Sequence, residues 1–109
     1  MNIRYTKSYD KTNKKLKKHN YESDNEDKIL KLIKNSNNFM ELSLNPLASQ
    51  YGFEQLKHEL NEFYSFNLCK IGGVIRLIIK PSTDNYVDLI FISYKHYDDF
   101  TLEKVIYYE

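Results

Sequence analysis

The stretch YKHYDDF, residues 94–100, follows a long apolar run and sets Lys95, His96 and Tyr97 side by side. An imidazole with a pKa of about 6.5 can give or take a proton near neutrality. One interpretation is therefore an acid–base site at the rim of a sheet. The other is a solvated turn, because a single histidine at the exit of a strand is most often a surface residue. The choice depends on which other groups reach the same edge.

An arginine inside an alternating strand is the second group that could do chemistry. In VIRLIIK, residues 74–80, three apolar side chains share one side: Ile75, Leu77 and Ile79. Arg76 falls on the other side, because successive strand residues point to opposite faces. Burying an unpaired guanidinium is costly, so we expect Arg76 on the open face of the sheet. If residues 86–93 pair with this strand, their exit brings His96 to the same face.

Hydrophobic periodicity predicts the elements that must position these groups. Strands are expected at residues 3–6, 64–69, 74–80 and 86–93, with the last one central. A polar helix is expected at 8–18, and a second helix after the capping box SDNE at 23–26. The apolar stripe of this second helix comprises Ile29, Leu30, Leu32, Ile33 and Met40, and the polar run at 35–38 loosens or ends it.

The remaining segments are predicted from breakers and short apolar patterns. Residues 43–52, with Pro46 and Gly52, are expected to form a loop. Residues 53–60 favour one or two helical turns, and residues 99–108 favour a short terminal helix or an added strand. The order of elements is a short strand, two helices, an antiparallel three-stranded meander and a short C-terminal helix. This order predicts an α+β domain with helices on one sheet face, and 109 residues suit a single domain, 1–109.

Composition limits the class of protein. Hydrophobic residues make up 41% of the chain, which allows a core, and no apolar run is long enough to cross a bilayer. The first ten residues contain no apolar signal region, so we expect a cytoplasmic protein without a membrane partner. The one cysteine, Cys69, excludes an internal disulfide and a cysteine-based metal cage.

The charges are unevenly distributed although the net charge is only +1. The first 19 residues carry seven basic side chains and one acidic one, whereas residues 97–109 are mainly acidic. A basic segment favours contact with a polyanion, and the candidates for such contact are Lys11, Lys14, Lys15 and Lys18. Ten tyrosines also suit base stacking. The alternative for these lysines is a solvated helix face.

Several motifs occur in an order that is typical of one group of proteins. EQLKHEL at 54–60 is followed by the aromatic strand YSFNL at 64–68, by IRL at 75–77 and by KHY at 95–97. This order resembles the RelE/ParE toxin superfamily and, within it, the YoeB-like messenger-RNA endoribonucleases. The resemblance implies a compact RelE-like fold that cuts messenger RNA in the ribosomal A site. It also implies neutralisation by a cognate antitoxin. The expected assembly is a toxin–antitoxin hetero-oligomer or a toxin homodimer.

The resemblance also implies a role for each matching residue. Glu54 stands at the place of the general base and Arg76 at that of the arginine that stabilises the phosphate. His96 matches the general acid, and Tyr97 matches the tyrosine that orients the scissile nucleotide. Lys57 matches a lysine near the RNA backbone, and Lys95 is a further candidate for contact with RNA.

These residue types suit metal-independent cleavage of RNA. The 2′-hydroxyl can attack the neighbouring phosphate if a base takes its proton and an acid protonates the leaving oxygen. A cation must face the extra negative charge of the transition state. No cofactor is expected, and Asp98 and Asp99 are spaced badly for a metal site. We interpret His19, His58, Glu59 and Glu62 as surface residues, with the two glutamates as alternative bases.

Three departures from the family pattern keep other functions open. The family places basic residues where this chain has Ser65 and Asn67, the loop at 69–73 is longer, and an acidic tail follows Tyr97. One alternative is a ParE-like toxin that inhibits gyrase without nuclease chemistry. The other is a catalytically degenerate member that only binds a partner protein.

Overall fold

The computed structural model describes residues 1–18, 25–69, 75–82 and 85–93 of the chain. The strands are β1 (Asn2–Tyr5), β2 (Glu54–Gln55), β3 (Tyr64–Asn67), β4 (Arg76–Pro81) and β5 (Tyr86–Ser93). The helices are α1 (Lys7–Lys18), α2 (Glu26–Asn35), α3 (Phe39–Leu44) and α4 (Pro46–Gln50), with a 3₁₀ turn at His58–Leu60. These elements form an α+β domain, as the sequence predicts.

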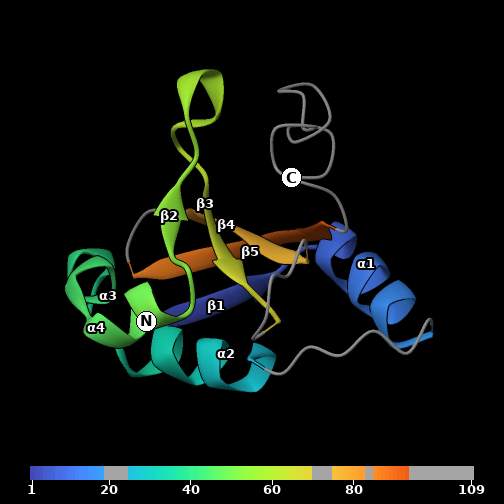
Figure 1. Cartoon of the computed structure of the whole chain (residues 1–109), viewed down its shortest axis with the longest axis horizontal. Helices are drawn as coiled ribbons and strands as arrows, with labels where there is room; N and C mark the ends of the chain where they lie inside the picture. The colour runs from blue at the N-terminus through green and yellow to red at the C-terminus, as the bar shows by residue number, and fades with distance from the viewer. Residues whose placement is uncertain (19–24, 70–74, 83–84, 94–109) are drawn as a thin grey trace.

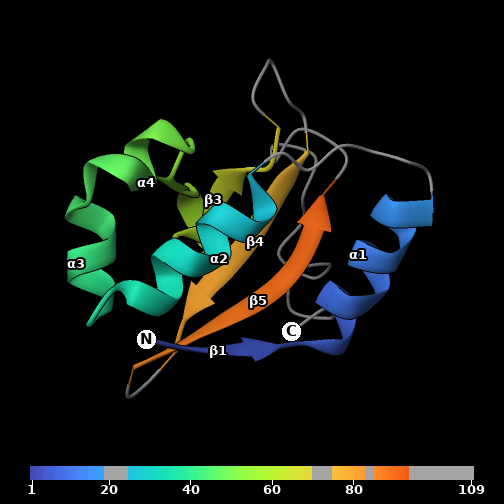
Figure 2. The ribbon, with the colours of Figure 1, turned by 90° about the horizontal axis from the view of Figure 1, so that it is seen from below.

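The strands form one mixed sheet in the order β1-β5-β4-β3-β2. Strands β2 to β5 make an antiparallel meander, and β1 adds to β5 in parallel. α2 lies across one face of the sheet, and β2 with the turn that follows it rises on the other side (Figures 1 and 2). β5 is therefore an interior strand between β1 and β4, in agreement with its apolar sequence.

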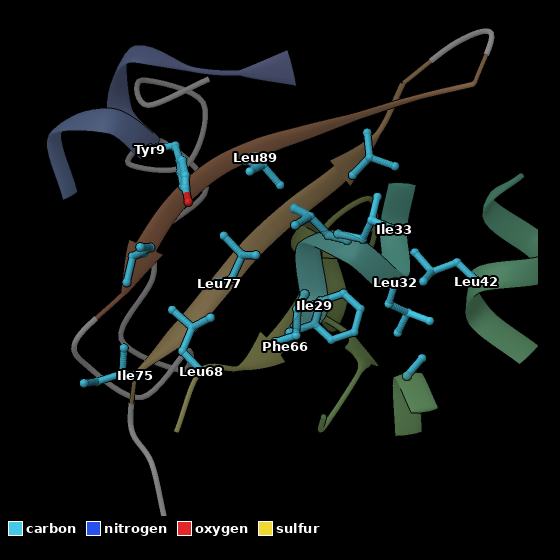
Figure 3. Close-up of a cluster of buried hydrophobic side chains, with 14 of the residues drawn as sticks. Tyr9, Ile29, Leu32, Ile33, Leu42, Phe66, Leu68, Ile75, Leu77 and Leu89 are labelled. Carbon is cyan, nitrogen blue, oxygen red and sulfur yellow. The ribbon is translucent and has the colours of Figure 1, made fainter. Parts of the chain in front are cut away.

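The main core fills the space between the sheet and α2. Phe66, Leu77 and Leu89 face the helix from three neighbouring strands, and Ile29 and Ile33 meet them from α2 (Figure 3). The three alternating side chains predicted to face the helices are all in this cluster: Ile75, Leu77 and Ile79. The inward face of the strand predicted at 74–80 is thus confirmed.

A smaller apolar cluster lies on the opposite face. It consists of Leu56, Phe63, Ile78, Ile90 and Phe91, with Leu60 packed against it. Three of these residues belong to β2, the 3₁₀ turn and their flanks, which fold back over β4 and β5. The open face is therefore covered in part by the chain's own hairpin.

A β-bulge in β5 allows two neighbouring residues to join this second cluster. Ile78 pairs with Phe91 and Ile79 pairs with Leu89, so Ile90 is an extra residue in β5. Ile90 and Phe91 both face the second cluster, whereas Leu89 faces the main core. A bulge changes the side-chain alternation of one strand without breaking the sheet.

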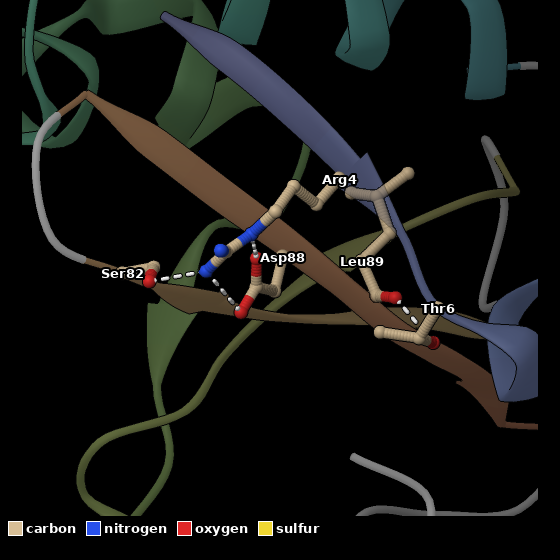
Figure 4. A network of polar contacts seen from close by, with 5 residues as sticks. All are labelled: Arg4, Thr6, Ser82, Asp88 and Leu89. Carbon is tan, nitrogen blue, oxygen red and sulfur yellow. Dashed lines mark hydrogen bonds and ion pairs between the residues drawn. The ribbon is translucent and has the colours of Figure 1, made fainter.

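The junction of β1 and α1 is tied to β5 by polar contacts (Figure 4). The Thr6 hydroxyl oxygen accepts a hydrogen bond from the Tyr9 N–H at 3.1 Å. The same hydroxyl donates to the Leu89 carbonyl oxygen, with 2.7 Å between the two oxygen atoms. Arg4 donates through Nε to Asp88 Oδ1 at 2.5 Å, and it also donates to Ser82. The hydrogen bond to Asp88 raises the pKa of the Arg4 guanidinium.

The Tyr9 hydroxyl links α1 to the start of α2. It donates to Glu26 Oε1 at 3.1 Å, and both side chains are buried. Burial and the negative charge of Glu26 raise the pKa of the Tyr9 phenol. Glu26 therefore stands at the first position of α2 as the acceptor of a buried hydrogen bond.

Tyr9→Phe is expected to lower the free energy of unfolding at pH 7 by roughly 1.5–3 kcal/mol, because the buried carboxylate loses a donor. The difference should shrink above about pH 10. Above this pH, Tyr9 ionises in the unfolded state but stays protonated in the folded state, which lowers the free energy of unfolding of the unsubstituted protein. Tyr9→Phe has no phenol at this position and does not undergo this loss. Urea denaturation at pH 7 and pH 10.5 measures both values. A difference that grows with pH would contradict the assignment.

Four local predictions were wrong. α2 begins at Glu26 with Asn25 as its N-cap, so Glu26 does not act as the third residue of a box started by Ser23. Met40 does not extend the stripe of α2, because α2 ends at Asn35 and α3 restarts the helix with a new phase. Met40 is 72% exposed.

The predicted loop at 43–52 contains α4. Pro46 occupies its first turn, and the Asn45 side chain accepts a hydrogen bond from the Leu47 N–H at 2.9 Å. Residues 53–60 are not a helix but β2 followed by the 3₁₀ turn, because the backbone of this segment pairs with β3. The predicted segment at 99–108 lies outside the described residues.

Candidate functional site

Glu54 projects from the open face of the sheet. Residues that stand directly opposite each other on paired strands share a face. Glu54 pairs with Ser65, Ser65 pairs with Ile78, and Ile78 pairs with Phe91, so one row crosses four strands. Because Ile78 and Phe91 belong to the second cluster, Glu54 lies on that face, and it is exposed there.

Arg76 occupies the next row along the same face. It pairs with Asn67 on β3 and with Ser93 on β5. Two strand spacings of about 4.8 Å and one two-residue step of about 6.7 Å put the Cα atoms of Glu54 and Arg76 roughly 12 Å apart. The carboxylate and the guanidinium therefore flank one stretch of the open face, as the alternation in residues 74–80 predicts for Arg76.

The bulge in β5 brings the end of that strand to Arg76. With strict alternation from Leu89, Ser93 would face the main core. The extra Ile90 reverses the alternation, so Ser93 shares the face of Arg76 and stands directly opposite it. His96 follows Ser93 by three residues, and Lys95, His96 and Tyr97 lie outside the described residues.

The guanidinium of Arg76 is held by a neutral neighbour. Arg76 is half-buried, and its Nη1 donates to Asn67 Oδ1. The backbone of Asn67 is itself fixed on both sides, because its N–H donates to the Tyr51 carbonyl oxygen at 2.7 Å. Its carbonyl oxygen accepts from Asn25 Nδ2 at 3.4 Å. Asn67 therefore orients a cation without cancelling its charge.

The lysines expected to contact RNA lie on two elements. Lys57 is exposed at the start of the 3₁₀ turn, three residues after Glu54. Among the α1 lysines expected to contact RNA, Lys11, Lys14 and Lys15 are exposed. Lys18 is the last residue of α1.

The middle of α1 is fixed beside the end of β5. The Thr12 hydroxyl oxygen accepts a hydrogen bond from the Ile92 N–H at 2.9 Å, where β1 no longer pairs with β5. Ile92 directly precedes Ser93, the partner of Arg76. The basic helix thus adjoins the end of β5 that pairs with the start of β4, where Arg76 stands.

Sequence reasoning missed the role of Asn67 and of Gly52. It treated Asn67 only as a position without a cation and Gly52 only as a breaker. The Asn67 N–H donates to the Tyr51 carbonyl oxygen, and a Cβ on Gly52 would meet the Asn67 side chain, so Gly52 lies beside Asn67 just before β2. This neighbourhood depends on how the chain before β2 meets β3, which the periodicity of the sequence does not indicate.

Within the described ranges, no three His, Cys, Asp or Glu side chains gather in a group that could hold a metal ion. In the same ranges, no helix is both long and apolar enough to cross a membrane.

Comparison with solved structures relates this fold to bacterial toxins. The chain is similar to a copper-bound mutant toxin from Helicobacter pylori, with a TM-score of 0.64 and 20% identity over 92% of this chain and 99% of that one. It is similar to a YoeB/ParE toxin from Agrobacterium tumefaciens, with a TM-score of 0.59 and 18% identity over 88% and 100%. A conserved hypothetical protein from Helicobacter pylori, HP0894, gives a TM-score of 0.51 and 16% identity over 85% and 92%.

No protein-family model and no curated protein sequence matches the chain. The similarity therefore lies in the fold, which this chain shares with a toxin from Helicobacter pylori and a YoeB/ParE toxin from Agrobacterium tumefaciens. The fold class that the resemblance implies is confirmed.

Proposed function

We propose that this protein is the toxin of a toxin–antitoxin module and that it cleaves messenger RNA in the ribosomal A site without a metal. The observation that carries the proposal is the shared open face of Glu54 and Arg76, with the end of β5 opposite Arg76. Three peptide units span at most roughly 11 Å, so His96 is within chain reach of this face. The toxin fold of the neighbours supports the same conclusion.

The proposed reaction is an in-line transfer within the RNA. The Glu54 carboxylate takes the proton of the 2′-hydroxyl, whose oxygen forms a bond to the adjacent phosphorus. The bond from phosphorus to the 5′-oxygen breaks, and the His96 imidazolium gives its proton to that oxygen. Arg76 stabilises the additional negative charge on the phosphate. The products are a 2′,3′-cyclic phosphate and a 5′-hydroxyl end.

The other proposed contacts hold and orient the substrate. Tyr97 stacks against the nucleotide at the cleaved bond, and Lys57 and Lys95 contact phosphates near it. The lysines of α1 would bind more distant phosphates: Lys11, Lys14, Lys15 and Lys18. The partner that neutralises the protein is an antitoxin, and its place of action is the cytoplasm, where messages are translated.

Expression in a bacterium tests the proposal. We expect the native chain to arrest growth and to produce new 5′ ends in messages, in phase with codons, and we expect His96→Ala to do neither. His58→Ala is the matched control, because His58 is an exposed histidine on the 3₁₀ turn. Growth arrest by both the native chain and His96→Ala, with DNA damage and uncut messages, would indicate a gyrase-directed toxin instead. If expression of the folded native chain does not affect growth, the remaining function is binding of a partner protein without catalysis.

A further inference from the structure

We propose that Asn67 is a positioning residue for Arg76 and that Gly52 makes room for it. This inference rests on the proposed function, in which Arg76 faces a phosphate. Asn67, Arg76 and Ser93 form one row across β3, β4 and β5. Gly52 lies beside Asn67, because a Cβ on residue 52 would meet the Asn67 side chain. Together these residues present a glycine, an amide, a guanidinium and a hydroxyl from four neighbouring segments.

The contact between Asn67 and Arg76 fixes the guanidinium in one direction. An amide oxygen accepts one of the five N–H donors of arginine and leaves the charge of the side chain unchanged. A carboxylate at the same place would also accept, but it would form an ion pair and compete with a phosphate. An asparagine at this position therefore orients Arg76 without adding a negative charge beside the guanidinium.

Gly52 is required for this arrangement on two grounds. Its φ is +71°, a conformation that side chains with a Cβ disfavour. A Cβ at residue 52 would also lie 2.6 Å from the Asn67 Cγ, so the amide of Asn67 would have to move. Loss of the glycine therefore displaces the group that orients Arg76.

Two hydrogen bonds to the backbone of Asn67 hold this residue in place. The N–H of Asn67 is bonded to Tyr51, the residue before Gly52, and its carbonyl oxygen accepts from Asn25 at the start of α2. The side chain of Asn67 thus extends from a fixed backbone, and little conformational freedom remains to be lost when Arg76 meets its ligand.

The test measures Arg76 directly by NMR. The sequence contains two arginines, Arg4 and Arg76, so Arg76→Lys assigns the two Nε–H signals. The probes are inorganic phosphate and an oligoribonucleotide with 2′-O-methyl groups, which lacks the nucleophile and is not cleaved. We expect both probes to shift the Arg76 signal. The Arg4 signal, from a side chain paired with Asp88, should move little.

Asn67→Asp separates a positioning role from a structural one. It keeps the acceptor and strengthens the pair with Arg76, so the fold should stay intact, but we expect the affinity for the oligoribonucleotide to fall at least about tenfold, because the ion pair competes with the phosphate. Asn67→Ala should also weaken binding, and its Arg76 signal should move toward that of a freely rotating side chain. Asn2→Asp makes the same chemical change at the far edge of the sheet and should bind as the native chain does. Native affinity in a folded Asn67→Ala variant would overturn the proposal, because alanine removes the acceptor that orients Arg76.

A double-mutant cycle tests the part of Gly52. Gly52→Ala should reduce binding in the native background and reduce it much less when Asn67 is already alanine, because the clash is then absent. Equal losses in both backgrounds would show that Gly52 acts only through its own backbone.

These outcomes are distinct from a failure of the proposed function. If the native chain does not cleave messages but Asn67→Ala abolishes the phosphate-induced shift of Arg76, the nuclease proposal is wrong and the positioning role stands. If Arg76→Lys abolishes cleavage and Asn67→Ala leaves both cleavage and the shift unchanged, the positioning role is wrong.

Discussion

Glu54→Gln is expected to slow RNA cleavage by roughly 10²- to 10⁴-fold while the protein stays folded. Glutamine keeps the shape of the side chain but cannot take the proton of the 2′-hydroxyl. Glu54 is exposed on a two-residue edge strand, so the free energy of unfolding should change by less than about 0.5 kcal/mol. Single-turnover cleavage on programmed ribosomes measures the rate, and urea denaturation measures the stability.

Glu59→Gln is the matched control for this change. Glu59 is also exposed and lies only five residues away, on the 3₁₀ turn rather than in the row that contains Ser65 and Ile78. We expect it to cleave within a few-fold of the native rate. Loss of cleavage in Glu59→Gln with a native rate in Glu54→Gln would move the general base to Glu59.

Phe66→Ala is expected to lower the free energy of unfolding by roughly 3–5 kcal/mol. Phe66 is fully buried on β3, faces α2 and packs against Phe53 with ring centroids 4.9 Å apart (Figure 3). Its removal leaves a cavity at the centre of the main core. Because small domains are stable by only about 5–15 kcal/mol, a large part of the total stability is lost. Urea denaturation followed by circular dichroism gives the value.

Phe39→Ala provides the comparison within the same fold. Phe39 is only half-buried at the start of α3, where its ring meets Tyr64 edge-on at 4.8 Å. We expect its loss to cost clearly less than that of Phe66, since water can fill the space. An equal cost for both variants would contradict the assignment of Phe66 to the centre of the core.

The parts of the fold that the sequence predicted well are those with local signals. The strand at 86–93 was predicted with the bounds that β5 has, because a long apolar run between turn residues has few alternatives. The helix at 8–18 starts one residue earlier in the structure. The face of Arg76 followed from the period of two in its own strand.

The parts that the sequence missed depend on partners far along the chain. β2 has only two residues, and it forms because its backbone can pair with the backbone of β3. α4 depends on a cap from Asn45 and on Pro46 in its first turn, whereas the sequence prediction treats Pro46 as a breaker. Ile90, the extra residue of the bulge, belongs to the same cluster as Leu56 and Phe63, and no turn residue in β5 marks its position. Side-chain pairing between Asn67 and Arg76 needed the register of two strands, which periodicity alone does not supply.

Because β5 contains an extra residue, the faces that its last residues occupy depend on the length of the strand more than on its amino-acid composition. Exchanging Ile90 for another apolar residue keeps the odd and even positions of the strand where they are. Deleting one residue between Leu89 and Ser93 would exchange those positions and send the downstream chain toward α2. Insertions and deletions in this short window should therefore be excluded in active relatives, even where the identities of its residues vary freely.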